Sequence, residues 1–263
     1  MQTDRHPESN VVIREPGWRR VLAWCVHGYT ALGLVIAAAI AVLIVEGTEA
    51  SFQRAFLLML VACVIDATDG TLARLVKIKE TLPQFDGARL DDIIDFQTYT
   101  SLPLLLIWRA GVLPEGWNWC LLAPLVASAY GFCQTSAKTD DGYFLGFPSY
   151  WNLVALYLYY LQLPGAVAVG SLLFFAGLTF VPLRYLYPTR RGWLNLVSFA
   201  LALPWTALLA YALSLNATHP DERAHIRQLM IASLYYPAYY FLVSWRISLR
   251  IWMQRRGQDA LSR

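Results

Sequence analysis

The chain has 263 residues, of which 57% are hydrophobic and only 15% are charged, and its mean hydropathy is +0.42. Soluble domains carry about a quarter charged residues, so this composition excludes an ordinary soluble domain and predicts a protein embedded in a lipid bilayer. We interpret the formal net charge of +3 as a consequence of membrane topology and as suited to contact with anionic lipid headgroups. We expect no nucleic-acid partner.

The chain begins with a polar segment, residues 1–20, which we interpret as an interfacial lead-in to a single membrane domain that accounts for the whole chain, residues 1–263. Apolar segments long enough to cross ~30 Å of hydrocarbon as helices follow. The eight expected spans are 21–45, 53–76, 90–112, 117–137, 149–164, 165–186, 193–214 and 226–250. Pro164 is compatible with a turn between two spans or with a kink in one broken helix. The expected fold class is an all-α, polytopic membrane helix bundle.

The distribution of basic residues predicts the orientation of these spans. An even number of spans places both termini on one side of the membrane. If that side is the cytoplasm, few of the 21 Lys and Arg residues fall in outward-facing segments, namely Arg54, Arg109, Arg223 and Arg227. This bias follows the positive-inside rule, so both termini are expected in the cytoplasm, together with the loop that joins the second and third spans.

That loop belongs to the most acidic stretch of the chain, DATDGTLARLVKIKETLPQFDGARLDDIID. Residues three or four apart lie on one face of a helix. Two such stripes end the second span and begin the third: Asp66, Asp69, Gly70, Ala73 and Arg74 on the second, and Gly87, Asp91 and Asp95 on the third. Because a short connection makes the two helices antiparallel neighbours, we expect the four carboxylates to converge.

Converging carboxylates repel one another unless a cation neutralises them, and ionisable residues within membrane proteins usually mark functional cavities. Oxygen ligands favour Mg²⁺ or Mn²⁺, and two such ions can clamp a diphosphate. Gly70, Ala73 and Gly87 leave room for a ligand near the backbone, and Arg74 offers a planar donor to phosphate or to a nucleotide hydroxyl. The alternative interpretation of the acidic stretch is a solvated, charged loop without a ligand. That interpretation suits the charged residues of the connecting loop, but it suits the eight residues in register less well.

Written as D-x2-D-G-x2-A-R-x12-G-x3-D-x3-D, the pattern from Asp66 to Asp95 resembles the signature of the CDP-alcohol phosphotransferases. Members of that family transfer a phospho-substituted group from a CDP-linked donor to an alcohol and release CMP. Most of them have eight residues where this chain has twelve, and the longer spacing is similar to that of the bacterial phosphatidylcholine synthase branch. The segments HGYTALG, FLGFPSYWN and FVPLRYLYP also resemble phosphatidylcholine synthases, the last two phosphatidylserine synthases as well.

The resemblance implies a multi-pass enzyme of phospholipid biosynthesis in the bacterial inner membrane, active at the cytoplasmic face and homodimeric. It implies that two Mg²⁺ or Mn²⁺ ions bind to four ligands: Asp66, Asp69, Asp91 and Asp95. Asp91 and Asp95 would be catalytic, with Asp95 as the general base for the acceptor hydroxyl. A metal-bound carboxylate is a weak base, so the alternative role of Asp95 is to orient the alcohol. The cytidine diphosphate site would be lined by Asp66, Asp69, Gly70, Ala73, Arg74 and Gly87.

The resemblance further implies transfer from CDP-diacylglycerol to choline, a quaternary ammonium that aromatic faces bind by cation–π attraction. Tyr150, Trp151 and Asn152, at the start of the fifth span, are candidate choline-binding residues, although packing is the commoner role of such aromatics. Arg184 and His27 are candidate ligands of the lipid phosphate. Arg184 also satisfies the positive-inside rule, and a buried histidine also serves as an interhelical hydrogen-bond partner.

Other functions stay open at this point. The same fold can use serine, inositol or glycerol phosphate as the acceptor. The segment DDIID, residues 91–95, matches the DDxxD motif of prenyl-transferring enzymes, which place two Asp motifs on widely separated helix pairs, whereas here both acidic clusters lie within one short stretch. A channel or transporter would distribute ionisable residues through the membrane, whereas these gather at one face.

Overall fold

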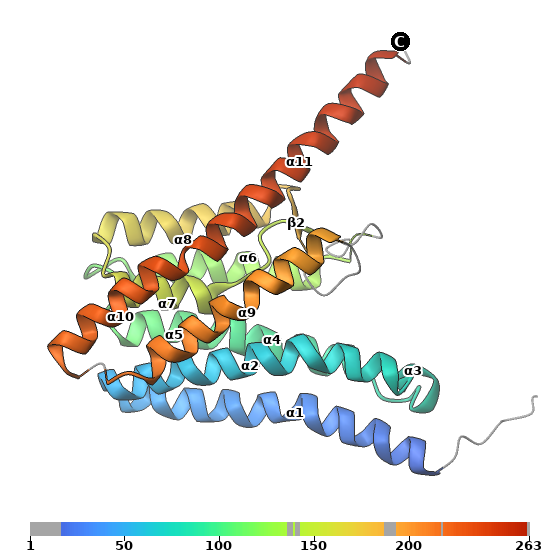
Figure 1. The fold of residues 1–263 in the computed structure, drawn as a ribbon, viewed down its shortest axis with the longest axis horizontal. Helices are drawn as coiled ribbons and strands as arrows, with labels where there is room; N and C mark the ends of the chain where they lie inside the picture. Colours follow the sequence, from blue (N-terminus) through green and yellow to red (C-terminus); the bar gives the residue numbers. More distant parts are fainter. Residues whose placement is uncertain (1–16, 136–138, 140–142, 187–192, 217, 262–263) are drawn as a thin grey trace, which may run out of the picture.

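The computed structural model describes residues 17–135, 139, 143–186, 193–216 and 218–261, and the side chains of the last helix as far as Gln254. Most of the expected lead-in, residues 1–16, lies outside the described residues. The helices pack side by side as a bundle, from which the last helix projects (Figure 1). The first half contains α1 (Gly17–Glu46), α2 (Glu49–Leu75), α3 (Ile78–Thr81), α4 (Gly87–Asp95), the π-helix η1 (Phe96–Ser101), α5 (Leu102–Arg109), the 3₁₀-helix η2 (Asn118–Leu121) and α6 (Leu122–Cys133).

The second half is also mainly helical and adds two short strands. Its elements are β1 (Tyr143–Leu145), α7 (Trp151–Leu161), α8 (Gly165–Thr179), β2 (Arg184–Leu186), α9 (Trp193–Ser214), α10 (Pro220–Ser233) and α11 (Tyr235–Leu261). Within the described residues, α1, α2 and α9 are long and apolar enough to cross a membrane, and Asn118–Cys133 and Gly165–Thr179 are shorter apolar helices. The expected helical membrane bundle is therefore confirmed in its coarse form.

The first two helices form an antiparallel pair joined by a tight turn. Gly47 has φ +70°, a conformation that glycine adopts without steric penalty. Thr48 and Ser51 then form a reciprocal capping box: Thr48 Oγ1 accepts the Ser51 N–H at 3.1 Å, and Ser51 Oγ accepts the Thr48 N–H at 2.8 Å. This turn lies at the end of the bundle opposite the acidic stretch.

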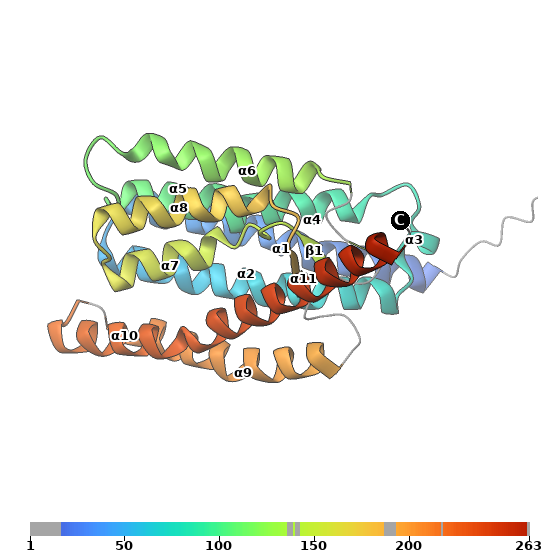
Figure 2. The same ribbon diagram turned by 90° about the horizontal axis from the view of Figure 1, so that it is seen from above.

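Two polar contacts hold α9 and α10 against the beginning of α2 at the same end. Gln53 is buried and its Nε2 donates to the Leu213 carbonyl at 2.9 Å and to the Leu215 carbonyl, so it caps the C-terminus of α9. Arg223 of α10 pairs with Glu49. The α9–α11 layer, which lies to one side of the other helices in Figure 2, is thereby tied to α2.

The third expected span is one continuous path made of α4, η1 and α5. Pro103 has no N–H and cannot donate to the Tyr99 carbonyl, as an α-helix would require. One residue earlier, the Leu102 N–H donates to the Gln97 carbonyl, an i→i−5 bond. The proline explains why the helix widens into a π-turn, a rare feature that occurs frequently at functional sites.

The fifth and sixth expected spans are separate helices. α7 ends where Gln162 takes a left-handed conformation, with φ +50°, and α8 begins directly after Pro164. The chain reverses its direction between them (Figure 2). Pro164 therefore belongs to a turn and does not kink one long helix.

Two expected spans have bounds that differ from the structure by more than a few residues. α8 ends at Thr179 instead of continuing to residue 186, because the following segment forms β2, which pairs antiparallel with β1. The last expected span, 226–250, is covered by α10 and α11, which begin earlier, end later and are separated at Leu234. Ser244 and Ser248 of α11 accept the N–H groups of Leu186 and Arg184 at 3.2 and 2.7 Å, so polar contacts anchor β2 to the last helix.

Candidate active site

Three carboxylates from two helices meet at one end of the bundle. Asp66 lies in the C-terminal half of α2, and Asp91 and Asp95 lie one turn apart on α4. One oxygen from each carboxylate lies within 4.8 Å of the other two, and all three side chains are half-buried. A hard cation takes oxygen ligands at about 2.0–2.6 Å, so ligands on either side of an ion are separated by up to twice that distance. The cluster therefore has the dimensions of a site for a divalent cation.

Asp69 lies apart from the three-carboxylate group. Its side chain is 6% exposed, and its Oδ2 accepts the Thr30 hydroxyl at 2.8 Å. Three residues advance an α-helix by about 300°, so Asp69 is turned about 60° from Asp66 and faces α1. This carboxylate is held by α1, whereas Asp66 faces the carboxylates of α4.

Tyr99 is a site residue that the sequence analysis missed. Its hydroxyl donates to Asp66 Oδ2 at 2.7 Å, and Tyr99 belongs to the π-helix that follows Asp95. The residue continues the four-residue spacing of Asp91 and Asp95, which was the available signal. The signal is weak, because most aromatic residues in membrane spans pack against other helices or lie at the membrane interface.

The motif residues near the end of α2 leave space on the helix surface. A Cβ at Gly70 would be 3.5 Å from Arg74 Nη1, an ordinary contact with a flexible side chain. Ala73 is half-buried. Arg74 is exposed and its Nη2 donates to Thr71 Oγ1 at 2.9 Å. Its guanidinium can therefore exchange this weak local contact for a phosphate or a nucleotide hydroxyl.

Gly87 begins α4 with its Cα against the ring of His27. A Cβ at Gly87 would lie 2.6 Å from His27 Cε1 and 3.0 Å from Nδ1. His27 is 5% exposed, and its ring centroid is 4.4 Å from that of Phe85 and 5.9 Å from that of Trp24. Among the described residues its Nε2 has no hydrogen-bond partner. The space that Gly87 leaves is thus filled by a histidine from α1.

The other candidate lipid-phosphate residue, Arg184, lies in β2. Its N–H donates to Ser248 Oγ at 2.7 Å, and its carbonyl accepts the Ser248 hydroxyl at 3.2 Å. The side chain is half-buried. These contacts fix the backbone of Arg184 to α11 and not to the helices that carry the carboxylates.

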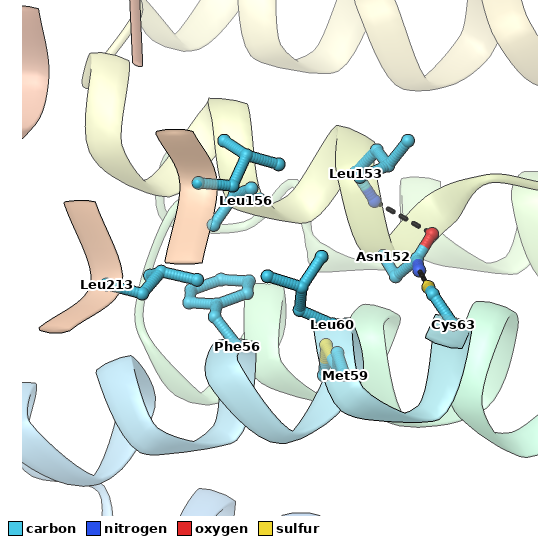
Figure 3. A pocket seen from close by; sticks show the side chains of 9 residues that line it. Phe56, Met59, Leu60, Cys63, Asn152, Leu153, Leu156 and Leu213 are labelled. Atoms are coloured by element: carbon cyan, nitrogen blue, oxygen red, sulfur yellow. Dashed lines mark hydrogen bonds between the residues drawn. The ribbon is translucent and has the colours of Figure 1, made fainter. Parts of the chain in front are cut away.

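The three candidate choline residues have different surroundings. Tyr150, which precedes α7, has ring centroids 6.3 Å from Tyr99 and 6.0 Å from Tyr240. Trp151 is fully buried and its Nε1 donates to Ser128 Oγ at 2.6 Å. Asn152 is 4% exposed and its Nδ2 donates to Cys63 Sγ at 3.0 Å (Figure 3). Tyr150 is the one of the three whose ring contacts another ring beside the carboxylates.

A small cavity lies deeper in the bundle, between α2, α7 and α9. Its volume is about 10 Å³, and apolar side chains dominate its wall (Figure 3). The lining residues are Phe56, Met59, Leu60, Cys63, Asn152, Leu153, Leu156, Leu209 and Leu213. Such a volume is at the lower limit for one water molecule, so this cavity is not a substrate site.

Comparisons with known proteins agree with the motif. The family model described as CDP-alcohol phosphatidyltransferase matches residues 27–183, which contain the three-carboxylate group. A phosphatidylcholine synthase of Legionella bozemanae is 39% identical over 194 residues, which cover 72% of this chain and 88% of the relative. A phosphatidylcholine synthase of Pseudomonas aeruginosa is 38% identical over 186 residues, or 70% and 76% of the two chains. A third, from Rhizobium meliloti, is 33% identical over 208 residues, or 79% and 85%.

Proposed function

The chain belongs to the CDP-alcohol phosphatidyltransferase family, and from that premise we propose that it transfers the phosphatidyl group of CDP-diacylglycerol to choline, giving phosphatidylcholine and CMP. The observation that carries the proposal is the meeting of Asp66, Asp91 and Asp95 within 4.8 Å, inside the range 27–183 that the family model matches; relatives that cover most of the chain are named phosphatidylcholine synthase. Membership of this family sets aside the prenyltransferase and transporter alternatives.

The reaction makes one P–O bond and breaks another. The choline hydroxyl oxygen attacks the phosphorus that carries diacylglycerol, and the bond from that phosphorus to the oxygen shared with CMP breaks. In this proposal Asp95 accepts the hydroxyl proton, because a carboxylate within hydrogen-bond reach can act as a general base. Asp91, one turn earlier on the same face of α4, would help Asp95 to hold the acceptor alcohol in position.

The carboxylates also provide ligands for divalent metal. Asp66, Asp91 and Asp95 would hold one Mg²⁺ or Mn²⁺ ion, and Asp69, at the adjacent turn of α2, would contribute to a second. Such ions would offset the charge of the diphosphate and of the departing CMP. The cytidine diphosphate would lie along Gly70, Ala73 and the exposed Arg74, and the glycine at the start of α4 would complete its site.

We assign the acceptor ammonium to the side of the site where Tyr150 lies. The Tyr150 ring is adjacent to Tyr99, whose hydroxyl bonds to Asp66, so a cation on these aromatic faces would be near a carboxylate. Trp151 and Asn152 would support this position through packing and hydrogen bonding. Arg184 and His27 remain our candidates for the lipid phosphate.

The proposed setting is the bacterial inner membrane, with eight spans, both termini in the cytoplasm and the carboxylates at the cytoplasmic face. The distribution of basic residues supports this orientation. The donor is a membrane lipid and choline is soluble in water, so a site at the membrane surface gives both access. The proposed assembly is a homodimer.

The test is CMP release by protein purified in detergent and supplied with CDP-diacylglycerol and Mn²⁺ or Mg²⁺. Choline, serine, inositol and glycerol 3-phosphate are compared in parallel. Asp95→Asn and EDTA should abolish release, whereas Asp92→Asn, which changes an exposed acid of the same helix, should not. Release with choline alone supports the proposal. Release with a different alcohol overturns the choice of acceptor, and no release from folded protein overturns the reaction.

A further inference from the structure

A line of polar side chains leads from the beginning of α7 towards Asp66. It starts at Asn152, whose Oδ1 accepts the Leu153 N–H at 2.9 Å. With the amide oxygen occupied, the amide nitrogen faces α2 and donates to Cys63 Sγ at 3.0 Å (Figure 3). Asn152 is 4% exposed, so its amide has an orientation that is fixed by two protein contacts.

Tyr99 connects this line to the carboxylate cluster. Its hydroxyl donates to Asp66 Oδ2 at 2.7 Å, and the Cys63 thiol lies near enough to interact electrostatically with it. Because a tyrosine hydroxyl has a single proton, the bond to Asp66 commits that proton to the carboxylate. The two observed donors on this line therefore point towards α2: Asn152 donates to Cys63, and Tyr99 donates to Asp66.

The π-helix explains how Tyr99 reaches Asp66. In an α-helix four residues advance by about 400°, or 40° past a full turn, so a residue eight positions after Asp91 would be turned about 80° from it. The wider π-turn after Asp95 reduces the rotation of each residue. Tyr99 consequently stays near the face of α4 that carries Asp91 and Asp95, and its hydroxyl spans the gap to α2.

We propose that Tyr99 is a positioning residue for the metal site, and that its hydrogen bond, supported by the neighbouring Asn152–Cys63 pair, fixes the Asp66 carboxylate for metal binding. The bond from Tyr99 engages Oδ2 of the Asp66 carboxylate and so restricts its rotation. Hydrogen-bonded partners of metal ligands orient those ligands. This inference rests on the proposed function, because it assumes that Asp66 binds the metal.

The test measures Mn²⁺ binding directly, without substrate, from the electron paramagnetic resonance signal of free Mn²⁺ in titrations of purified protein. Tyr99→Phe removes one hydroxyl and keeps the ring. Loss of an outer partner typically lowers metal affinity 10- to 100-fold, so we expect the Mn²⁺ dissociation constant to rise about tenfold. Cys63→Ala should cause a smaller rise, and Cys63→Ser, which keeps a donor, should recover part of it.

Tyr157→Phe is the matched control, because it also removes a tyrosine hydroxyl that is hydrogen-bonded inside the bundle, here to Ser233 at 2.9 Å. It should leave Mn²⁺ binding unchanged within about twofold, although it loses a bond of similar strength. Asp66→Asn should abolish binding at the cluster. The melting temperature of each variant shows that it is folded.

The outcomes separate the two proposals. Weaker Mn²⁺ binding in Tyr99→Phe but not in Tyr157→Phe supports the positioning role. Unchanged binding in Tyr99→Phe, together with loss in Asp66→Asn, overturns that role and leaves the metal site intact. Unchanged binding in Asp66→Asn overturns the metal site itself, and the positioning role with it.

Discussion

Replacing Gly87 with alanine tests why a glycine begins α4. Gly87 is not one of the glycines with positive φ, so alanine meets no backbone penalty there. The added Cβ would instead lie 2.6 Å from His27 Cε1 and 3.0 Å from Nδ1. Carbon atoms in contact are normally separated by about 3.5–4.0 Å. The ring or the helix must therefore move by about 1 Å.

The ring has little room to move, because Phe85 and Trp24 pack against it at centroid distances of 4.4 and 5.9 Å. Overpacking of this kind costs about 1–3 kcal/mol. Alanine in place of glycine at a helical position recovers about 0.5–1 kcal/mol. The expected net loss for Gly87→Ala is about 1–2 kcal/mol. At about 2–4 °C per kcal/mol for a chain of this size, the melting temperature should fall by about 4 °C.

The assay is thermal unfolding in detergent of the wild type, Gly87→Ala, His27→Ala and the double variant. Removal of the imidazole makes room for the new Cβ, so the double variant should melt above Gly87→Ala, with a favourable coupling of about 1–2 kcal/mol. His27→Ala alone loses ring contacts worth about 1 kcal/mol. If the double variant is as unstable as the sum of the single variants, contact with His27 is not the reason for the glycine.

Three further predictions concern single bonds or turns. Thr30→Val removes the hydroxyl that donates to the buried Asp69 carboxylate at 2.8 Å, so it should lower the free energy of unfolding by about 1.5–3 kcal/mol and raise the KM for CDP-diacylglycerol. Thr30→Ser should preserve both values. Wild-type stability and KM in Thr30→Val would contradict the role of the bond. Gln53→Leu removes the cap of α9 and should lower thermal stability by about 1–2 kcal/mol without altering Mn²⁺ affinity; a change in that affinity would be the contrary result. Gly146→Ala places a side chain at a residue with φ +82°, and the new Cβ would lie 2.3 Å from the Thr179 carbonyl oxygen. The variant should lose more than ~2 kcal/mol of unfolding free energy. A wild-type melting temperature would refute the close approach.

The sequence predicts the helices well because apolar length and periodicity are local properties. The span expected at 193–214 has the same bounds as α9. The four-residue spacing also brought Asp91 and Asp95 to one face of α4, and a short connection made α2 its neighbour. These features depend on helix geometry and chain length, which the sequence contains directly.

Contacts between distant residues could not be derived in this way. Helical spacing grouped Asp69 with Asp66, but a 60° difference in direction turns Asp69 towards Thr30 of α1. His27 fills the space at Gly87 because α1 packs against α4, a contact across sixty residues that no local pattern encodes. The π-turn results from Pro103, which cannot donate to the carbonyl four residues earlier. The sequence therefore indicates where the helix is disturbed, but it does not indicate that the disturbance brings Tyr99 to Asp66.

The π-turn also determines which changes in chain length the third span can absorb. An i→i−5 turn encloses one residue more than the α-turn it replaces, so η1 holds a residue that an unbroken α-helix would not need. Deletion of one residue elsewhere in Gly87–Arg109 would rotate everything downstream by about 100° and turn the apolar face of α5 away from its neighbours. Deletion within Phe96–Ser101 would instead remove that extra residue and keep the direction of α5, with Pro103 still unable to donate in the shortened turn. The span is therefore least sensitive to shortening beside its carboxylates, and a related chain one residue shorter there would keep α4 and α5 but lose the reach of Tyr99.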